Sequence, residues 1–234
     1  MKKILIVILV FTLCAYAADI ADLNSDGLND IVIGAFEANE VRVFWGNSNG
    51  EWTSDLLSAS SSECIGIDIA DFNGDGLLDI AAACAGSDII QIFYNQGGLS
   101  PEWVLLEAVT GFDGVHDVFA GDIDADGDID IVAAASEGDE VAWFRNDGTE
   151  WTKFSIETGI DYPCKVEISD IDLDGNVDII CAAWTGNLVK VWYGSGGTTP
   201  SWTAQVIDST INGAHGISVC DVDAMETWIF LLPH

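Results

Sequence analysis

The sequence predicts an all-β fold built from one repeated unit, and three observations lead to that prediction. A nine-residue loop with Asp or Asn at positions 1, 3, 5 and 9 and Gly at position 6 occurs four times, at intervals of about fifty residues. A short apolar run follows each loop, which is typical of a buried strand. Aromatic residues then recur at the same offsets in every unit.

The first strand of each unit alternates and leads into the loop. It is expected at Gly66 to Ala70, Val118 to Gly121, Val166 to Ser169 and Gly216 to Cys220. A second strand follows the loop, and Gly/Asn-containing turns at 37–39, 137–139 and 185–187 lead to a third strand. The third strands carry Phe44, Phe93, Phe144 and Trp192, and the fourth strands open with Trp52, Trp103, Trp151 and Trp202.

Four antiparallel strands in about fifty residues correspond to one blade of a β-propeller. Small residues dominate the first two strands and aromatic residues the last two, which fits a wedge that is narrow at an axis and broad at its rim. The aromatic stripe is expected to pack blade against blade. The alternative is a platform on which sugars stack.

The loops are predicted to bind Ca²⁺. Their side chains offer only hard oxygen ligands, their glycine permits a sharp turn, and position 7 would contribute a backbone carbonyl. Soft ligands are absent, which disfavours zinc and copper. About four Ca²⁺ ions are expected in all. The predicted ligand residues are Asp22, Asn24, Asp26, Leu28 and Asp30; Asp71, Asn73, Asp75, Leu77 and Asp79; Asp122, Asp124, Asp126, Asp128 and Asp130; and Asp170, Asp172, Asp174, Asn176 and Asp178.

Two other loop types share part of this pattern. An EF-hand needs a bidentate Glu at position 12 and flanking helices, but position 12 here is Ile33, Ala82, Ala133 or Cys181 and strands follow. Plain Asp/Asn/Gly turns need no metal. Four loops of identical spacing favour a metal site over chance turn chemistry.

The repeat is interrupted at the carboxyl end. A fifth unit starts at Asp221, but Met225 and Glu226 stand where the loop would continue with Asp and Gly, and 224–234 match no repeat position. Four repeats make a partial propeller. Alternatively, the strand Gly216 to Cys220 completes the first unit and closes a four-bladed ring.

The amino terminus resembles a secretory signal peptide. Lys2 and Lys3 precede an apolar stretch that ends in the small residues Ala15 and Ala17, and the stretch is short for a membrane-spanning helix. We expect cleavage near Ala17, export to the cell surface, the medium or a periplasm, and no membrane insertion afterwards. Residues 18–223 would then form the repeat domain.

The charge of the chain indicates which kinds of binding partner are unfavourable. The chain has 39 acidic and 7 basic side chains and a formal net charge of −32, which disfavours nucleic acid as a partner.

The cysteines and histidines are interpreted by their repeat positions. Cys84, Cys181 and Cys220 fall at positions where other repeats have small residues, which favours buried thiols. Cys64 and Cys84 flank one hairpin, and whether they form a disulfide stays open. His116 and His215 share an offset and are expected at strand ends or along a central channel, and no catalytic residues are predicted.

These loops, with third strands such as Val141-Ala-Trp-Phe-Arg-Asn146, resemble the FG-GAP/VCBS-type repeats of β-propellers similar to integrin α-subunits. The likeness spans residues 19 to 223. It implies structural Ca²⁺ sites on one face of the propeller and an adhesion, lectin-like or other ligand-binding role.

Three functions follow from the sequence. The first is an exported calcium-binding propeller that binds a protein or glycan. The second is a calcium-dependent polysaccharide lyase, which the scattered basic residues disfavour. The third is an interaction repeat within a larger cell-surface protein.

Overall fold

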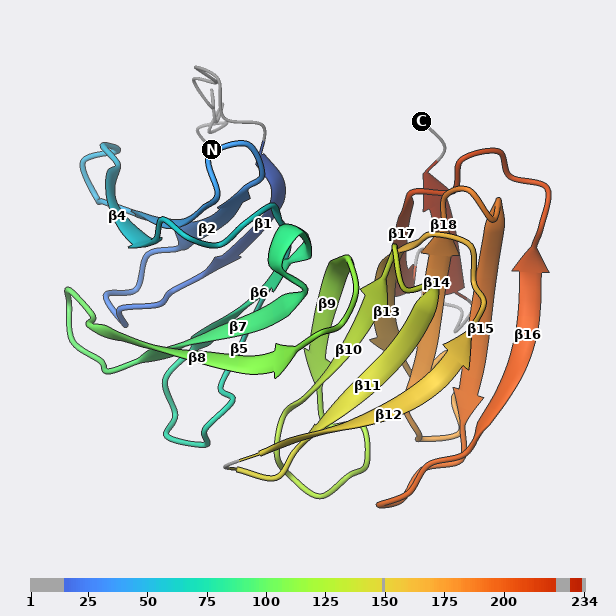
Figure 1. Cartoon of the computed structure of the whole chain (residues 1–234). Helices are drawn as coiled ribbons and strands as arrows, with labels where there is room; N and C mark the ends of the chain where they lie inside the picture. Colours follow the sequence, from blue (N-terminus) through green and yellow to red (C-terminus); the bar gives the residue numbers. More distant parts are fainter. Residues whose placement is uncertain (1–14, 149, 222–227, 233–234) are drawn as a thin grey trace.

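The computed structural model describes residues 15–148, 150–221 and 228–232, and in it the four repeats form four antiparallel sheets of four strands each (Figure 1). The first sheet comprises β1 (Ala15–Ala21), β2 (Asp30–Ala35), β3 (Glu40–Trp45) and β4 (Thr53–Ser58). The second comprises β5 (Cys64–Ala70), β6 (Asp79–Cys84), β7 (Ile89–Asn95) and β8 (Trp103–Thr110).

The third and fourth sheets follow the same plan. The third comprises β9 (Val115–Gly121), β10 (Asp130–Ala135), β11 (Glu140–Asn146) and β12 (Trp151–Thr158). The fourth comprises β13 (Pro163–Ser169), β14 (Asp178–Ala183), β15 (Leu188–Gly194) and β16 (Trp202–Asp208). The helix η1 (Ala85–Ser87) is a single 3-10 turn between β6 and β7.

Each sheet is a simple meander, with strands hydrogen-bonded in chain order from an inner to an outer strand. The inner strands of successive sheets contact one another, β1 with β5, β5 with β9 and β9 with β13. Sheets related by their inner strands are the blades of a propeller, so the predicted all-β propeller of four-stranded blades is confirmed.

A fifth, two-stranded sheet follows the fourth blade. Its inner strand β17 (Gly216–Asp221) pairs with β18 (Trp228–Leu232) and contacts β13. The alternative in which Gly216 to Cys220 completes the first sheet is therefore not what the structure adopts, because β17 has its own partner and β1 is itself seven residues long. The broken loop at Met225 and Glu226 lies outside the described residues, although the segment beyond it supplies β18.

The core lies between sheets. All six residues of β6, β10 and β14 are buried, because each of these second strands has a neighbouring sheet on both faces. Four apolar clusters form, each uniting residues of two consecutive sheets. Burial of apolar area between neighbouring blades is thus the main favourable term in joining them.

The aromatic stripe of the third strands packs blade against blade. Phe93, Phe144 and Trp192 are about 1% exposed and belong to the inter-sheet clusters. The ring of Phe144 meets that of Phe112 edge-on, with centroids 5.1 Å apart, and such contacts add to the area term. These three rings are closed to any ligand, so the sugar-platform alternative is wrong for them.

Cys64, Cys84, Cys164 and Cys181 are buried free thiols. Cys64 stands directly opposite Cys84 in the β5–β6 ladder. Burial raises the pKa of Cys181 well above its usual value, and raises that of Cys164 to about 12. Within the described ranges no helix is long and apolar enough to cross a membrane.

Candidate metal centres

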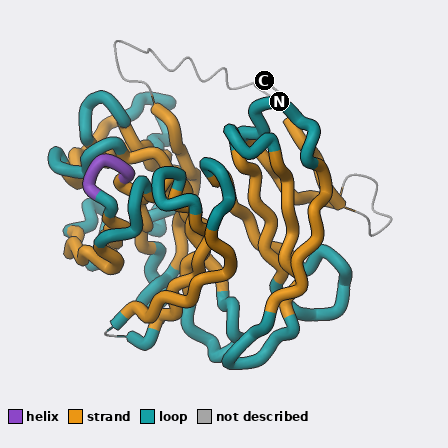
Figure 2. The backbone as a smooth tube through the Cα atoms, turned by 45° about the vertical axis from the view of Figure 1, so that its right-hand side comes forward, coloured by secondary structure: helices purple, strands orange, loops and turns teal. Residues whose placement is uncertain are grey.

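Figure 2 shows loops and turns at both ends of the strands. Each nine-residue loop connects the first and second strands of its sheet, at the end where the inner strand finishes. The inner strands of neighbouring blades run in the same direction, so the four loops share one face of the propeller. All the predicted ligand residues therefore lie where the sequence places them, between inner strand and second strand.

The carboxylate at position 1 holds the turn together. In the third loop, Asp122 Oδ1 accepts a hydrogen bond from the Asp126 N–H at 3.1 Å, and Oδ2 accepts one from the Gly127 N–H at 3.1 Å. The same two bonds form in the other three loops, from Asp22, Asp71 and Asp170. One side chain thus fixes the backbone at positions 5 and 6 and keeps its remaining lone pairs toward the loop interior.

Two residues of every loop adopt left-handed backbone conformations. Position 6 is glycine throughout, with φ from 85° to 100°, and a Cβ there would meet nothing within 4 Å, so backbone conformation rather than space requires the glycine. Position 4 is also left-handed, with φ of 59° at Ser25, 59° at Ala125 and 61° at Leu173. Sequence analysis did not identify position 4, because only Gly74 marks it with a glycine.

The carboxylate at position 9 is fully buried in all four loops. In the third loop, Asp130 Oδ2 accepts from the Ile123 N–H at 3.1 Å and Oδ1 accepts from the Asn146 N–H at 2.8 Å. Asp30, Asp79 and Asp178 make the equivalent pair of bonds. Position 9 therefore joins the loop to the end of the third strand, a structural role in addition to the predicted ligand role.

Burial and crowding make these carboxylates costly to ionise. Burial raises the pKa of Asp130 to about 7 and that of Asp79 to about 6, although two backbone N–H groups oppose the shift in each case. Neighbouring loop carboxylates, Asp124 and Asp126 beside Asp130, raise the pKa further. The backbone donors alone do not compensate the buried charge, and a bound cation would.

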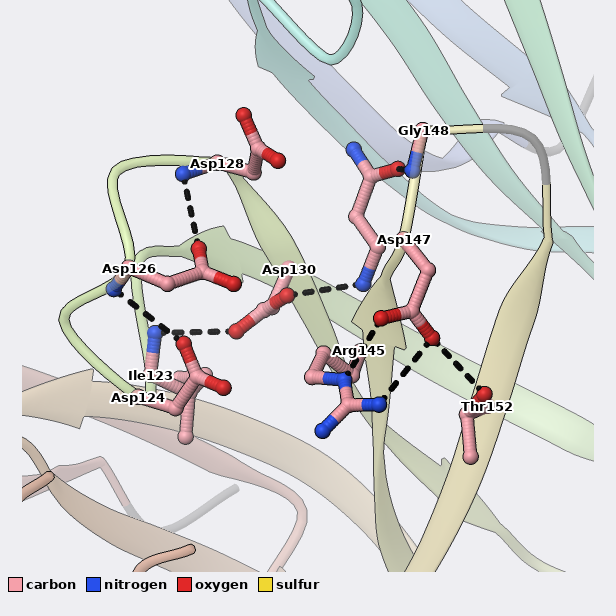
Figure 3. Close-up of polar contacts among 10 residues, drawn as sticks. Ile123, Asp124, Asp126, Asp128, Asp130, Arg145, Asp147, Gly148 and Thr152 are labelled. Atoms are coloured by element: carbon pink, nitrogen blue, oxygen red, sulfur yellow. Dashed lines mark hydrogen bonds and ion pairs between the residues drawn. The ribbon is translucent and has the colours of Figure 1, made fainter. Parts of the chain in front are cut away.

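Two of the loops bring three carboxylates close enough to share an ion. One oxygen each from Asp122, Asp124 and Asp130 lies within 4.8 Å of the others, and Asp170, Asp172 and Asp174 form a second such group. Figure 3 shows Asp124, Asp126 and Asp130 converging, whereas the Asp128 carboxylate points away from them, as expected if position 7 offers only its backbone. In the first two loops the amide oxygens of Asn24 and Asn73 stand at position 3.

The third loop also has a cationic neighbour. The Arg145 guanidinium is paired with Asp147, Nε to Oδ1 at 2.9 Å (Figure 3). Desolvation and the charge of Asp126 raise the pKa of Asp124, and the charge of Arg145 opposes part of this shift. This loop has five acidic residues, more than any other, so Arg145 offsets part of the extra repulsion.

Two asparagines connect neighbouring blades at the loops. Asn95 donates through Nδ2 to Leu23 O of the first loop at 2.8 Å and to Leu78 O of its own loop at 3.1 Å. Asn146 donates in the same way to Phe72 O at 2.7 Å and Ile129 O at 3.1 Å. The corresponding residues of the first and fourth sheets are Gly46 and Gly194. Sequence analysis missed these ties, because an Asn at the end of a strand looks like ordinary turn chemistry.

The chain matches the profile of the FG-GAP-like repeat over residues 22–82, 71–133 and 122–181. No curated protein sequence matches it at a significant level.

Two solved structures share the fold at low identity. The first is a lectin of Agrocybe aegerita, described as recognising non-reducing terminal N-acetylglucosamine, with a TM-score of 0.63, 19% identity, and coverage of 92% of this chain and 60% of that one. The second is a putative phosphatase of Bacteroides thetaiotaomicron, with a TM-score of 0.57, 11% identity, and coverage of 90% and 57%. The chain spans somewhat more than half the length of each.

Proposed function

The chain belongs to the FG-GAP-like repeat family, and from that premise we propose that it is an exported β-propeller that holds Ca²⁺ in its four loops and binds a protein or glycan partner. The calcium has a structural role. The partner contacts surfaces that the calcium-ordered blades keep in place.

The donor set supports calcium over other metals. Every loop offers carboxylate, amide and carbonyl oxygens and no sulfur or imidazole, and hard divalent cations take such ligands. Ca²⁺ accepts six to eight oxygens in irregular geometry, which suits loops whose carboxylates also bond the backbone. The observation that carries the proposal is the hydrogen-bond network, repeated four times, that holds the carboxylate oxygens of each loop together.

Export is supported by the amino-terminal sequence, in which Lys2 and Lys3 precede an apolar stretch. The β1–β2 ladder is regular from Ala17 to Ala21, after a register shift that the inner strands of the other three blades also have near their start. Cleavage near Ala17 would leave the regular part of β1 in place. Expression with the native amino terminus and mass spectrometry of the exported protein test this step, and a mature chain that still begins at Met1 would refute it.

A binding role agrees with the architecture and with the printed description of one structural relative as a lectin. Propellers present loops on two faces around a rigid body, so one scaffold serves many partners. Here one face is occupied by the metal loops, and the opposite face is available for a partner.

Chelation tests the calcium proposal directly. At a free calcium concentration about tenfold above Kd, each site adds about 1.4 kcal/mol to the free energy of unfolding. Four sites together would contribute an amount comparable to the whole stability of a typical domain. Thermal unfolding should therefore occur at a much lower temperature in EGTA than in calcium, with MgCl₂ as the ionic control. An unchanged melting temperature in EGTA would refute structural calcium.

A further inference from the structure

A cavity of about 270 Å³ lies on the axis of the propeller, at the end opposite the metal loops. Residues of β1, β5, β9 and β13 line it together with His215 and Gly216 at the start of β17. The metal loops follow the last residue of each inner strand, whereas the polar residues of the cavity stand at the strands' beginnings. The cavity is therefore separate from the metal centres.

An ion pair lies in this cavity. Lys165 Nζ is 3.0 Å from Asp117 Oδ2, and the same oxygen accepts a hydrogen bond from the Val166 N–H at 2.9 Å. Asp117 is only 5% exposed. The same position of the other inner strands is occupied by Ala17, Gly66 and Gly216, so the pair is no part of the repeat. A charged pair placed in one blade junction alone has a role other than building blades.

Two histidines stand beside the pair. His116 and His215 come from different blades, and their ring centroids are 5.8 Å apart. Desolvation, with the nearby His215, lowers the pKa of His116 to about 4, so its imidazole is neutral under ordinary conditions. A neutral imidazole offers one hydrogen-bond donor and one acceptor, and His116 already bonds the Cys164 backbone, which leaves one of the two for a ligand.

The histidines belong to a closed circuit of four aromatic rings. His116 contacts Tyr162 at 5.8 Å, Tyr162 contacts Trp184 at 5.5 Å, and Trp184 contacts His215 at 5.7 Å, with each pair of rings nearly perpendicular. Trp184 is 47% exposed. The circuit thus connects the cavity to solvent.

Tyr162 adopts a left-handed backbone conformation in this circuit. Its φ is 55°, and the same repeat position is left-handed at Glu63, Gly114 and Gly213 as well. The conformation is thus a feature of the repeat, and only the side chain is particular to Tyr162. The tyrosine contributes an aromatic ring that glycine cannot provide.

The chemistry of the cavity does not favour charged ligands. Asp117 and Lys165 compensate one another, so the pair offers a charged group no net counter-charge, and a net charge of −32 would repel an anion. The groups that remain are neutral donors and acceptors, a self-compensating ion pair and a half-exposed indole face. Small-molecule sites of this kind combine apolar rings with a few convergent polar groups. An uncharged molecule with several hydroxyl groups and one apolar face matches them.

We propose that the axial cavity binds an uncharged sugar, which stacks on Trp184 and forms hydrogen bonds with His116, His215 and the Asp117–Lys165 pair. The inference rests on the proposed binding function and gives it a site and a ligand class. It requires no contribution from the metal loops beyond keeping the blades in place.

Saturation-transfer NMR on the whole chain in calcium tests the inference. The probes are glucose, galactose, mannose and N-acetylglucosamine, with glucosamine as the cationic and glucuronate as the anionic counterpart. At least one neutral sugar should receive saturation, and the two charged sugars should bind at least about tenfold more weakly than the best neutral one. Absence of signal from all neutral sugars, or binding of charged sugars alone, overturns the inference.

Matched variants locate the site. Trp184→Ala should weaken binding of the responding sugar by about tenfold or more. Trp52→Ala removes a tryptophan of similar exposure, 44%, before β4 and should leave binding unchanged. If Trp184→Ala lowers the melting temperature, His215→Gln provides a second variant that keeps a hydrogen-bonding side chain and should also weaken binding. Equal affinities for wild type and all variants place any sugar elsewhere and overturn the inference.

The same samples separate this inference from the calcium proposal. A lower melting temperature in EGTA without sugar binding refutes the axial site and leaves the calcium role intact. Sugar binding with an unchanged melting temperature in EGTA refutes structural calcium and supports the axial site.

Discussion

The carboxylate at position 1 of each metal loop has two roles, because both of its oxygens hold the turn and it is also a predicted ligand. The side chain at position 3 makes fewer hydrogen bonds, since it accepts only from the N–H at position 5. In two loops this position is occupied by Asn24 and Asn73 and carries no carboxylate. The loops were predictable from the sequence because each task requires a particular residue type at fixed spacing. The left-handed backbone at position 4 was not predictable, because Ser25, Ala125 and Leu173 are not residue types that favour this conformation.

The difference between these positions gives a paired prediction for the third loop. Asp122→Asn should lose most of that loop's calcium stabilisation, about 1.4 kcal/mol with calcium about tenfold above Kd. Asp124→Asn is the control and should keep most of it, because the amide retains the hydrogen bond from the Asp126 N–H. Denaturant unfolding with calcium and with EGTA measures both. Equal losses in the two variants would contradict this division of roles.

The buried carboxylate of Asp68 should make the stability of the protein depend on pH. Burial raises the pKa of Asp68 from 3.8 to about 7; Asp19 and Asp117 raise it further, and the Ala120 and Ile69 N–H groups lower it. The folded pKa exceeds the unfolded one, so this contribution to stability is fully present below pH about 4 and is lost as the pH rises through about 7. Lys165, whose own pKa Asp68 helps to raise, is the nearby cation.

Asp68→Asn isolates that contribution. The amide oxygen still accepts from the Ala120 N–H, but the side chain no longer titrates. Between pH 4 and pH 7.5 the wild-type protein should lose more stability than the variant, at one fixed saturating calcium concentration. Parallel stability curves for the two proteins would show that Asp68 titrates normally.

At the scale of secondary-structure elements, the junctions between blades rest on two kinds of contact. Apolar clusters join every pair of consecutive sheets, and the sequence predicted them through its small-residue strands and recurring aromatics. Asparagine ties join only some pairs: Asn95 links the first two blades and Asn146 the next two. These ties could not be predicted, because they depend on the distance between a strand end and a loop carbonyl in another repeat. The pairing of β17 with β18 escaped prediction for the same reason, since no motif marks β18.

Asn146 should therefore matter more than its place at a strand end suggests. Asn146→Ala removes donors from Phe72 O and Ile129 O and an acceptor from the Gly148 N–H, in a site where Asn146 is 2% exposed. We expect a loss of about 2–4 kcal/mol in the free energy of unfolding. Asn212→Ala, on an exposed turn, should change it by less than about 0.5 kcal/mol. Urea unfolding measures both, and similar values for the two variants would rule out the tie.

At the scale of the whole molecule, the sequence predicted the architecture but not the cavity on its axis. Propeller architecture followed from the repeat length, but the axial cavity did not, because its charged and imidazole side chains occur in only some of the repeats. His116 and His215 were predicted at strand ends or along a channel, and both line the cavity. The sequence could place them on the axis, but it could not show that Tyr162 and Trp184 would complete the circuit of rings.

The charge predicts a salt dependence that calcium should suppress. In EGTA, repulsion among carboxylates is screened over about 8 Å at 0.15 M salt but only over about 30 Å at 0.01 M. Raising NaCl from about 0.01 M to 0.15 M should therefore raise the melting temperature more in EGTA than in calcium. Sucrose of equal osmolality is the control for non-ionic effects. Equal salt effects in both conditions would indicate that the loops contribute little to the repulsion.

The glycine at 194 has a consequence for the order in which the protein opens. No asparagine tie reaches from the fourth blade to Ile123 of the third loop, because a side chain at 194 would place its Cβ 2.2 Å from Val177 O. On the face of the metal loops, the asparagine ties thus link the first three blades and stop at this junction, where the contacts of Asp117 with Lys165 and the Val166 N–H lie at the opposite end of the inner strands. In native-state hydrogen exchange, the amides from β13 onward should form a separate cooperative unit, a foldon that exchanges before the first three blades do.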